Sequence, residues 1–218
     1  MLRWNHPLYG SIYPPFILYL AKEGGILEEL EKKIFDNASA AIYKTSQEYD
    51  GEFKISINIT AKSLFWDIES YLSECLSKYN IPAKRLWVEI TEQDMISNAD
   101  FVIDKLKRLK NYGHVLLIDD FGMGHTSLIY LQSNYFGVVK LDGSLISHLE
   151  ENPTNQKIVA SIVELGNELD IKVIAEYVET PAQQRMLEQL GCTWYQGYLY
   201  SKPLTLDDFI AYLKECNA

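Results

Sequence analysis

Strand-like and helix-like stretches alternate along the chain from about residue 50 to its end. The strand-like stretches are short apolar or alternating runs, and the stretches between them have helical spacing. Alternation of this kind is typical of a parallel sheet whose strands are joined by right-handed helical crossovers. The sequence predicts six strands, at residues 55–60, 86–91, 115–119, 138–142, 171–176 and 193–199.

A βα barrel is the favoured arrangement of these strands. An eight-stranded barrel usually needs about 250 residues, whereas this chain has 218. We therefore expect either that one or two early strands precede Met1 or that the barrel is incomplete. The alternative is an open doubly wound sheet, but the Gly-rich phosphate loop that such sheets usually carry is absent.

The segments outside the strands are mostly predicted to be helical. Residues 1–15 contain several Pro and Gly breakers and are expected to be irregular. Helices are predicted at residues 16–22, 27–43, 67–79, 97–112, 126–132, 153–169, 181–190 and 205–214. With 47% hydrophobic residues, the chain can form one sizeable core, so we expect a single domain over residues 1–218.

The central strand ends in two adjacent carboxylates, Asp119 and Asp120, which are followed by a Gly-rich segment. Neighbouring side chains on a strand point to opposite faces, so the two acids can share a site only where the strand is ending. Two carboxylates held close together repel each other unless a cation lies between them. Hard divalent cations such as Mg²⁺ bind carboxylate oxygen.

Polar residues also end the other predicted strands. Because the carboxyl ends of the strands in a βα barrel meet at one rim, these side chains are expected to converge. The oxygen ligands among them could hold one or two hard cations; they are Asn58, Glu89, Asp119, Asp120 and Glu176. Lys140 is the one cation in the set, and it could position or deprotonate a water. Gln196 could orient a water or bind a phosphate oxygen.

Two reaction classes fit this chemistry. Two metal ions with a lysine suit the attack of water on a phosphodiester. One metal ion with a lysine base suits proton abstraction next to a carboxylate, as in enolase-type barrels. The adjacent pair Asp119–Asp120 favours the first class, and spacing alone leaves both open.

Composition excludes several other classes. A net charge of −10 with no basic stripe argues against a nucleic-acid duplex as partner. No apolar run approaches the roughly 20 residues of a membrane span, so no membrane contact is expected from this segment. The three cysteines and four histidines show no disulfide or zinc-ligand spacing, which fits a reducing, cytoplasmic location, although a full-length protein could be membrane-anchored.

Ordered motifs along nearly the whole chain resemble the EAL domain family of cyclic di-GMP phosphodiesterases. The first motif, Arg3-Trp4 with His6-Pro7, is similar to the segment that follows the family's Glu-Ala-Leu signature. The later motifs are Asn58-Ile59-Thr60, Glu89-Ile90-Thr91-Glu92, Asp119-Asp120-Phe121-Gly122, Lys140-Leu141-Asp142, Glu176-Tyr177-Val178-Glu179-Thr180, Gln196-Gly197-Tyr198 and Lys202-Pro203-Leu204.

The resemblance implies a TIM-like barrel with one antiparallel strand and hydrolysis of cyclic di-GMP to linear pGpG. It implies two Mg²⁺ or Mn²⁺ ions on the five oxygen ligands named above, with Lys140 acting on the attacking water. Glu179 would brace the loop from Asp120 to Leu128, and Gln196 would lie near the water or metal. Substrate contacts would come from Arg3, Asp120 and Pro203. A homodimer through the loop after Asp120 and adjacent helices, and upstream sensory or GGDEF domains, are also implied.

The chain departs from the family pattern in two main places. The signature Glu, a metal ligand in the family, is absent from the chain, which begins just past it: either the sequence was cut inside the second strand or the chain is a natural remnant of the domain. Tyr177 stands where the family usually has Gly, and it would be strained if the backbone there has φ above zero. His125 and Thr126 replace the common Tyr-Ser. These departures motivate two alternatives, a non-catalytic cyclic di-GMP receptor and a protein-interaction module that binds no nucleotide.

Overall fold

A six-stranded parallel sheet forms the centre of the protein. The computed structural model describes residues 4–91, 99–122 and 131–216. The sheet order follows the chain, so each strand pairs with the next along the sequence. The strands are β3 (Ile55–Ile59), β4 (Leu86–Thr91), β5 (Val115–Phe121), β6 (Phe136–Leu141), β7 (Lys172–Ala175) and β8 (Trp194–Tyr195). The prediction of six parallel strands after residue 50 is confirmed.

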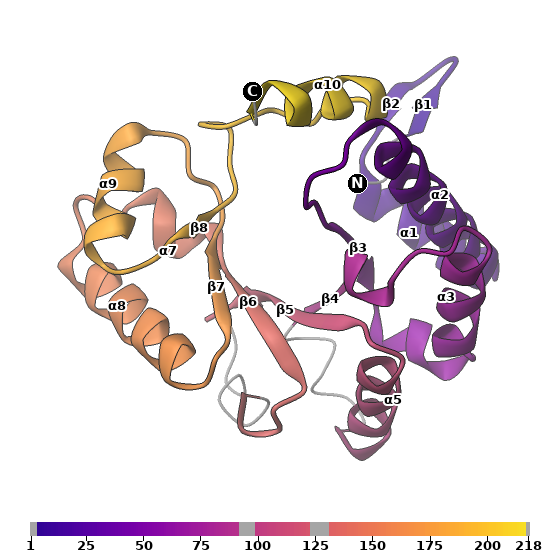
Figure 1. Ribbon diagram of the computed structural model, residues 1–218, viewed down its shortest axis with the longest axis horizontal. Helices are drawn as coiled ribbons and strands as arrows, with labels where there is room; N and C mark the ends of the chain where they lie inside the picture. Colours follow the sequence, from indigo (N-terminus) through magenta and orange to yellow (C-terminus); the bar gives the residue numbers. More distant parts are fainter. Residues whose placement is uncertain (1–3, 92–98, 123–130, 217–218) are drawn as a thin grey trace.

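Helices cover the outer side of the curved sheet, as Figure 1 shows. The longer ones are α1 (Pro14–Glu23), α2 (Leu27–Glu48), α3 (Ile68–Ser77), α5 (Ala99–Asn111), α8 (Pro153–Glu168), α9 (Pro181–Gln189) and α10 (Leu206–Cys216). The short ones are η1 (Ala61–Phe65), η2 (Ala83–Arg85) and α7 (Gly143–Ser147). Helix α10 packs on α2, where Lys214 pairs with Glu48 at 3.3 Å. The described helices are all too short or too polar to span a membrane.

The two faces of the strands bury different residues because successive side chains alternate. The face toward the helices carries the main hydrophobic core, with Val88, Leu116 and Val139 among its members. The inner face carries a second, smaller apolar cluster of Trp87, Leu117, Val138 and Ile174. Two positions further along the chain from each of these four residues comes a charged residue, within the strand in β4, β5 and β6 and directly after it in β7. On the inner face, each of these strands therefore has an apolar residue that packs near its start and a charged residue at its carboxyl end.

The described sheet begins at β3 and ends at β8, and no pairing joins these two strands. The ring of strands is therefore open on that side in the described part of the chain. A cavity of about 400 Å³ lies along the inner face. Its lining includes Ser56, Trp87, Lys140 and Gln196, so it runs from the starts of the strands to their carboxyl ends.

The prediction of an irregular segment over residues 1–15 was wrong for part of that range. Strands β1 (Trp4–His6) and β2 (Gly10–Ile12) form an antiparallel pair apart from the main sheet. The His6 ring closes the turn between them, because its Nδ1 accepts hydrogen bonds from the backbone N–H groups of Leu8 and Tyr9. Strands of three residues are too short for a period-2 pattern to stand out in the sequence.

Other boundaries differ by a few residues. Helix α2 extends to Glu48, and the last strand is only Trp194–Tyr195 rather than residues 193–199. The short helix α7 was not predicted; its N-cap is Asp142, whose side chain accepts a hydrogen bond from the N–H of Ser144. The predicted helix at 126–132 lies mostly outside the described residues.

Candidate metal centre

Strand β5 brings Asp119 and Asp120 to the same side. Pairing with β6 shifts register between Ile118 and Phe121, so the two acids lie at an irregularity of the ladder. Asp120 has a φ of +54°, in the left-handed region that Asp adopts more readily than most residues. This local turn removes the strict alternation of the strand. As a result, carboxylate oxygens of both residues lie within 4.8 Å of each other.

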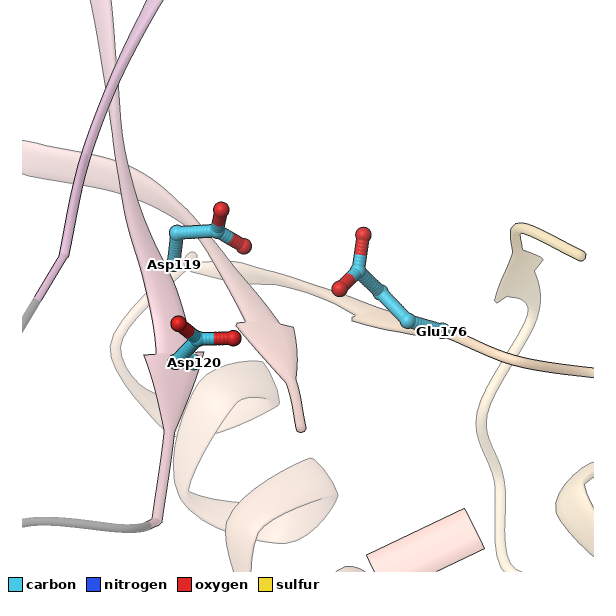
Figure 2. Close-up of side chains that lie close together, drawn as sticks. All are labelled: Asp119, Asp120 and Glu176. Atoms are coloured by element: carbon cyan, nitrogen blue, oxygen red, sulfur yellow. The ribbon is translucent and has the colours of Figure 1, made fainter. Parts of the chain in front are cut away.

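Glu176 completes a group of three carboxylates. It follows the last residue of β7, and its side chain points toward the end of β5 (Figure 2). One oxygen each from Asp119, Asp120 and Glu176 lies within 4.8 Å of the others. Glu176 is only 7% exposed. Burial raises the pKa of Glu176, while the Lys140 ammonium opposes that rise.

Lys140, on β6, lies at the centre of the acidic group. Its Nζ is 2.6 Å from Oε1 of Glu176, 3.3 Å from Oε2 of Glu89 and 3.3 Å from Oδ1 of Asp119. Burial alone would lower the pKa of Lys140, but the charges of Glu89, Glu176 and Asp119 together raise it above its usual value. The side chain therefore stays charged in this environment.

Negative charge exceeds positive charge at this rim. The Lys140 ammonium pairs with three carboxylates, those of Glu89, Asp119 and Glu176, and Asp120 adds a fourth carboxylate beside Asp119 and Glu176. Burial and the nearby charges of Asp119 and Asp142 raise the pKa of Asp120. Oδ1 of Asp119 is buried without a well-formed hydrogen bond, although it lies 3.3 Å from Lys140. A buried acceptor and surplus carboxylates are the donor set that a hard divalent cation needs. The residues present therefore fit such ions.

Glu89 and Asn58 belong to the same rim. They are paired in register on β4 and β3. Glu89 is 3% exposed and accepts a hydrogen bond from Lys140. Asn58 is exposed and lies two residues after Ser56, which lines the inner cavity. The strand alternation therefore places Asn58 on the inner face. The structure thus brings the strand-end residues of β3 to β7 to one edge.

The remaining predicted site residues are more peripheral. Gln196 lines the same cavity as Lys140 and Glu89, and its backbone joins β7 by donating to the carbonyl of Ala175. Glu179 and Pro203 are exposed, in the segments that follow β7 and β8. Arg3, His125, Thr126 and most of the loop that Glu179 was expected to brace lie outside the described residues.

Gln183 is a supporting residue that the sequence analysis missed. Its Oε1 accepts hydrogen bonds from the backbone N–H groups of Glu179, at 2.8 Å, and Thr180, at 3.0 Å. Its Nε2 donates to the carbonyl of Ile146 in α7. Gln183 therefore fixes the segment after Glu176 against α7. The Thr-x-x-Gln spacing at the start of α9 is a capping-box signal that would have identified it.

Comparison with known proteins identifies the family. The model of the EAL domain family matches residues 1–203. The chain belongs to the EAL domain family. Over 212 residues it is 31% identical to MucR of Pseudomonas aeruginosa, a bifunctional diguanylate cyclase/cyclic di-GMP phosphodiesterase, covering 97% of this chain and 31% of MucR. The chain thus spans about a third of that relative's length.

Solved EAL structures share the fold. The PaMucR phosphodiesterase in a c-di-GMP complex aligns with a TM-score of 0.89 at 31% identity, covering 96% of this chain and 85% of that one. BlrP1 of Klebsiella pneumoniae, in a manganese/cy-diGMP complex, aligns with a TM-score of 0.73 at 30% identity, covering 83% and 47%. These matches confirm the prediction of a TIM-like EAL barrel. In the described residues, the antiparallel pairing is confined to β1 and β2.

Proposed function

We propose that this EAL-type domain, residues 1–218, hydrolyses cyclic di-GMP to linear pGpG with the help of two divalent cations. The single observation that carries the proposal is the convergence of Glu89, Asp119 and Glu176 on Lys140, with Asp120 beside them. The relatives support it, because MucR is named as a cyclic di-GMP phosphodiesterase and its solved phosphodiesterase is a c-di-GMP complex.

The ions proposed are Mg²⁺ or Mn²⁺, held by Asn58, Glu89, Asp119, Asp120 and Glu176. Such ions supply charge stabilisation for phosphoryl oxygens and a nucleophile at neutral pH. The carboxylates of this rim hold the ions and bring the phosphodiester to one place. Related EAL structures in calcium and manganese complexes with cyclic di-GMP support a divalent cation here.

Lys140 acts at the centre of this site as a donor of hydrogen bonds. The surrounding carboxylates keep its ammonium charged, so it orients a water or a phosphoryl oxygen rather than taking up a proton. Its charge also opposes the negative charge that develops on the phosphoryl oxygens. Gln196, on the same cavity, orients the water or ligand, and Glu179 braces the loop after Asp120. Arg3, Asp120 and Pro203 contact the substrate.

The proposal extends to the assembly. We infer a homodimer through the loop after Asp120 and its adjacent helices, a cytoplasmic location, and sensory or GGDEF domains upstream. MucR, which combines both named activities in one chain, supports the last of these. Size-exclusion chromatography with light scattering tests the dimer directly, since a monomer at micromolar concentration contradicts it.

The test of the reaction is the appearance of pGpG by liquid chromatography when the protein is incubated with cyclic di-GMP and Mg²⁺ or Mn²⁺. The assay uses the chain together with any native sequence that precedes Met1. Turnover that requires the metal and is lost in Lys140→Ala supports the proposal. No pGpG from metal-loaded, folded protein refutes it.

A second candidate is a receptor that binds cyclic di-GMP without cleaving it. The observation that favours it is Tyr177, whose φ of +57° places a large side chain in strained backbone directly after Glu176. Calorimetric binding of cyclic di-GMP without metal dependence and without pGpG formation would favour the receptor. Metal-dependent turnover decides for the enzyme. A protein that binds no nucleotide leaves only the interaction role.

A further inference from the structure

Tyr177 is an exposed aromatic residue held in an unusual backbone conformation at the rim. It follows Glu176 directly, and its φ of +57° is in the left-handed region. Bulky side chains rarely adopt this conformation because of the steric cost. The side chain is 63% exposed, so burial of the ring in the core does not compensate for that cost.

The position of the ring is set by Gly143, the first residue of α7. A Cβ atom built on Gly143 would lie 2.4 Å from Cδ2 and 2.6 Å from Cγ of Tyr177. Carbon atoms do not approach this closely without displacement. The ring of Tyr177 therefore lies directly against the backbone of Gly143, and any larger residue there would displace it.

The ring belongs to the same rim as the acidic group. Tyr177 directly follows Glu176 in the chain, and its ring lies against Gly143, the neighbour of Asp142. Asp142 also donates its backbone N–H to the carbonyl of Phe121, at 3.4 Å. The N-terminus of α7, and the ring resting on it, are thereby tied to the end of β5 that carries Asp119 and Asp120.

The outer face of the ring has no aromatic or cationic partner among the described residues. Tyr195 differs in this respect, because it stacks on Tyr200 at a centroid distance of 6.1 Å and donates to the carbonyl of Cys192. One face of Tyr177 is thus fixed by Gly143, and the exposed remainder is presented beside the carboxylates. An aromatic face held in this way can stack on a planar ring.

We propose that Tyr177 is a ligand-contacting residue that stacks on a purine base of the nucleotide bound at the acidic group. This inference rests on the proposed function, because that function supplies a purine dinucleotide to this rim. The acidic group and Lys140 bind the phosphodiester, and Tyr177 contacts a purine base of the same nucleotide. Gly143 is the positioning residue that fixes the angle of the ring.

The experiment measures two dissociation constants by calorimetry for each folded variant, one for Mn²⁺ alone and one for cyclic di-GMP with Ca²⁺ present. Removing an aromatic that stacks on a base typically weakens binding by about tenfold. We expect Tyr177→Ala to bind cyclic di-GMP about tenfold more weakly and to retain Mn²⁺ binding. Tyr177→Phe keeps the π-face and should bind like the parent, whereas Tyr177→Leu should resemble Tyr177→Ala.

Gly143→Ala provides a matched control at the other side of the contact. It should weaken cyclic di-GMP binding because the new methyl group displaces the ring. In a Tyr177→Ala background the same change should add little, since no ring is left to displace. Additive losses in the double variant would show that Gly143 acts independently of Tyr177 and would refute its positioning role.

The possible failures are distinguishable. If the parent protein binds no cyclic di-GMP, the proposed function fails and this inference fails with it. If the parent binds and Tyr177→Ala binds equally well, only the inference is overturned. Equal affinity of Tyr177→Phe and Tyr177→Leu for cyclic di-GMP also overturns it. Stacking requires an aromatic face, which Phe has and Leu lacks, whereas either side chain can make a simple apolar contact.

Discussion

The two ends of the inner sheet face differ in chemistry although the same strands build them. At the strand starts, Trp87, Leu117, Val138 and Ile174 form a small apolar cluster. Two residues later, Glu89, Asp119, Lys140 and Glu176 form a buried group of charges. At the apolar end, side chains of complementary shape are enough for stable packing. The charged end has buried like charges and left-handed residues, which cost stability and indicate function.

Aromatic and basic residues also meet at the apolar end, but in a different way. Lys54 lies 5.4 Å from the ring centroid of Trp87 and 5.7 Å from that of Trp194, and Lys172 lies 4.8 Å from Trp194. These cations are at the surface and are stabilised by the rings. At the charged end the cation is buried and surrounded by carboxylates. Residues that stabilise the fold therefore lie at the starts of the strands, and the candidate site lies at their carboxyl ends, as is usual in βα barrels.

The largest effect should follow from removing the central cation. Lys140→Ala takes away the donor that orients water or phosphate, so we expect kcat to fall by about 10³-fold, the upper end of the range for removing one preorganised hydrogen-bond donor. Rates of pGpG formation at saturating Mn²⁺ measure this. Lys140→Arg is the control for charge alone. A Lys140→Ala variant that retains the parental kcat would contradict the claim that the charged end of the inner face carries out catalysis.

The next effect concerns stability at the apolar end of the sheet. Leu86, the first residue of β4, is fully buried, so Leu86→Ala should lower the free energy of unfolding by about 3 kcal/mol through lost contacts and a cavity. Urea denaturation measures it. Below the melting temperature, kcat should be unchanged. A loss of kcat in protein shown to be folded would mean that the two ends are coupled.

A smaller effect of opposite sign is expected at Asp120. Burial and neighbouring carboxylates raise its pKa, so in the absence of metal the ionised side chain opposes folding. Asp120→Asn should raise the melting temperature by roughly 1–2 °C, a modest shift for a chain of this size, and should weaken Mn²⁺ binding. Differential scanning calorimetry with and without Mn²⁺ tests both. A lower melting temperature without metal would contradict the electrostatic account.

The smallest effect should come from His114 at the start of β5. Burial lowers its pKa, opposed by a hydrogen bond with the carbonyl of Leu86, and its Nε2 has no partner. A lowered pKa means that the folded state favours the neutral ring. Its contribution is therefore complete above the unfolded pKa of about 6.5 and is lost as pH falls below that value.

The measurement is urea denaturation at pH 7.5 and 5.5. The free energy of unfolding should fall more for the parent than for His114→Gln, which cannot gain a proton. An equal decrease in both proteins would show that His114 is not responsible for the pH dependence.

The convergence of Glu89, Asp119, Lys140 and Glu176 could be predicted because parallel strands place their carboxyl ends on one edge. That argument needs only strand order and period. Which oxygen faces which atom could not be predicted, because it depends on the register shift after Ile118 and on the left-handed turn at Asp120. Tertiary packing decides both.

The contact between Tyr177 and Gly143 was also beyond the sequence. The strain at Tyr177 could be anticipated from the family's Gly, and the φ of +57° confirms it. The contact of the ring with Gly143 could not be anticipated, because α7 was not predicted and lies more than 30 positions before Tyr177 in the chain. The β1–β2 hairpin was missed for a local reason, because its turn is closed by a side-chain acceptor on His6.

Anomalous diffraction at the manganese edge, from crystals grown with Mn²⁺ and cyclic di-GMP, examines the metal centre directly. The account predicts two peaks at the carboxyl ends of β4, β5 and β7, within ligand distance of Glu89, Asp119, Asp120 and Glu176, with Lys140 beside them. Crystals that contain the nucleotide at this rim but show no anomalous peak there would contradict it.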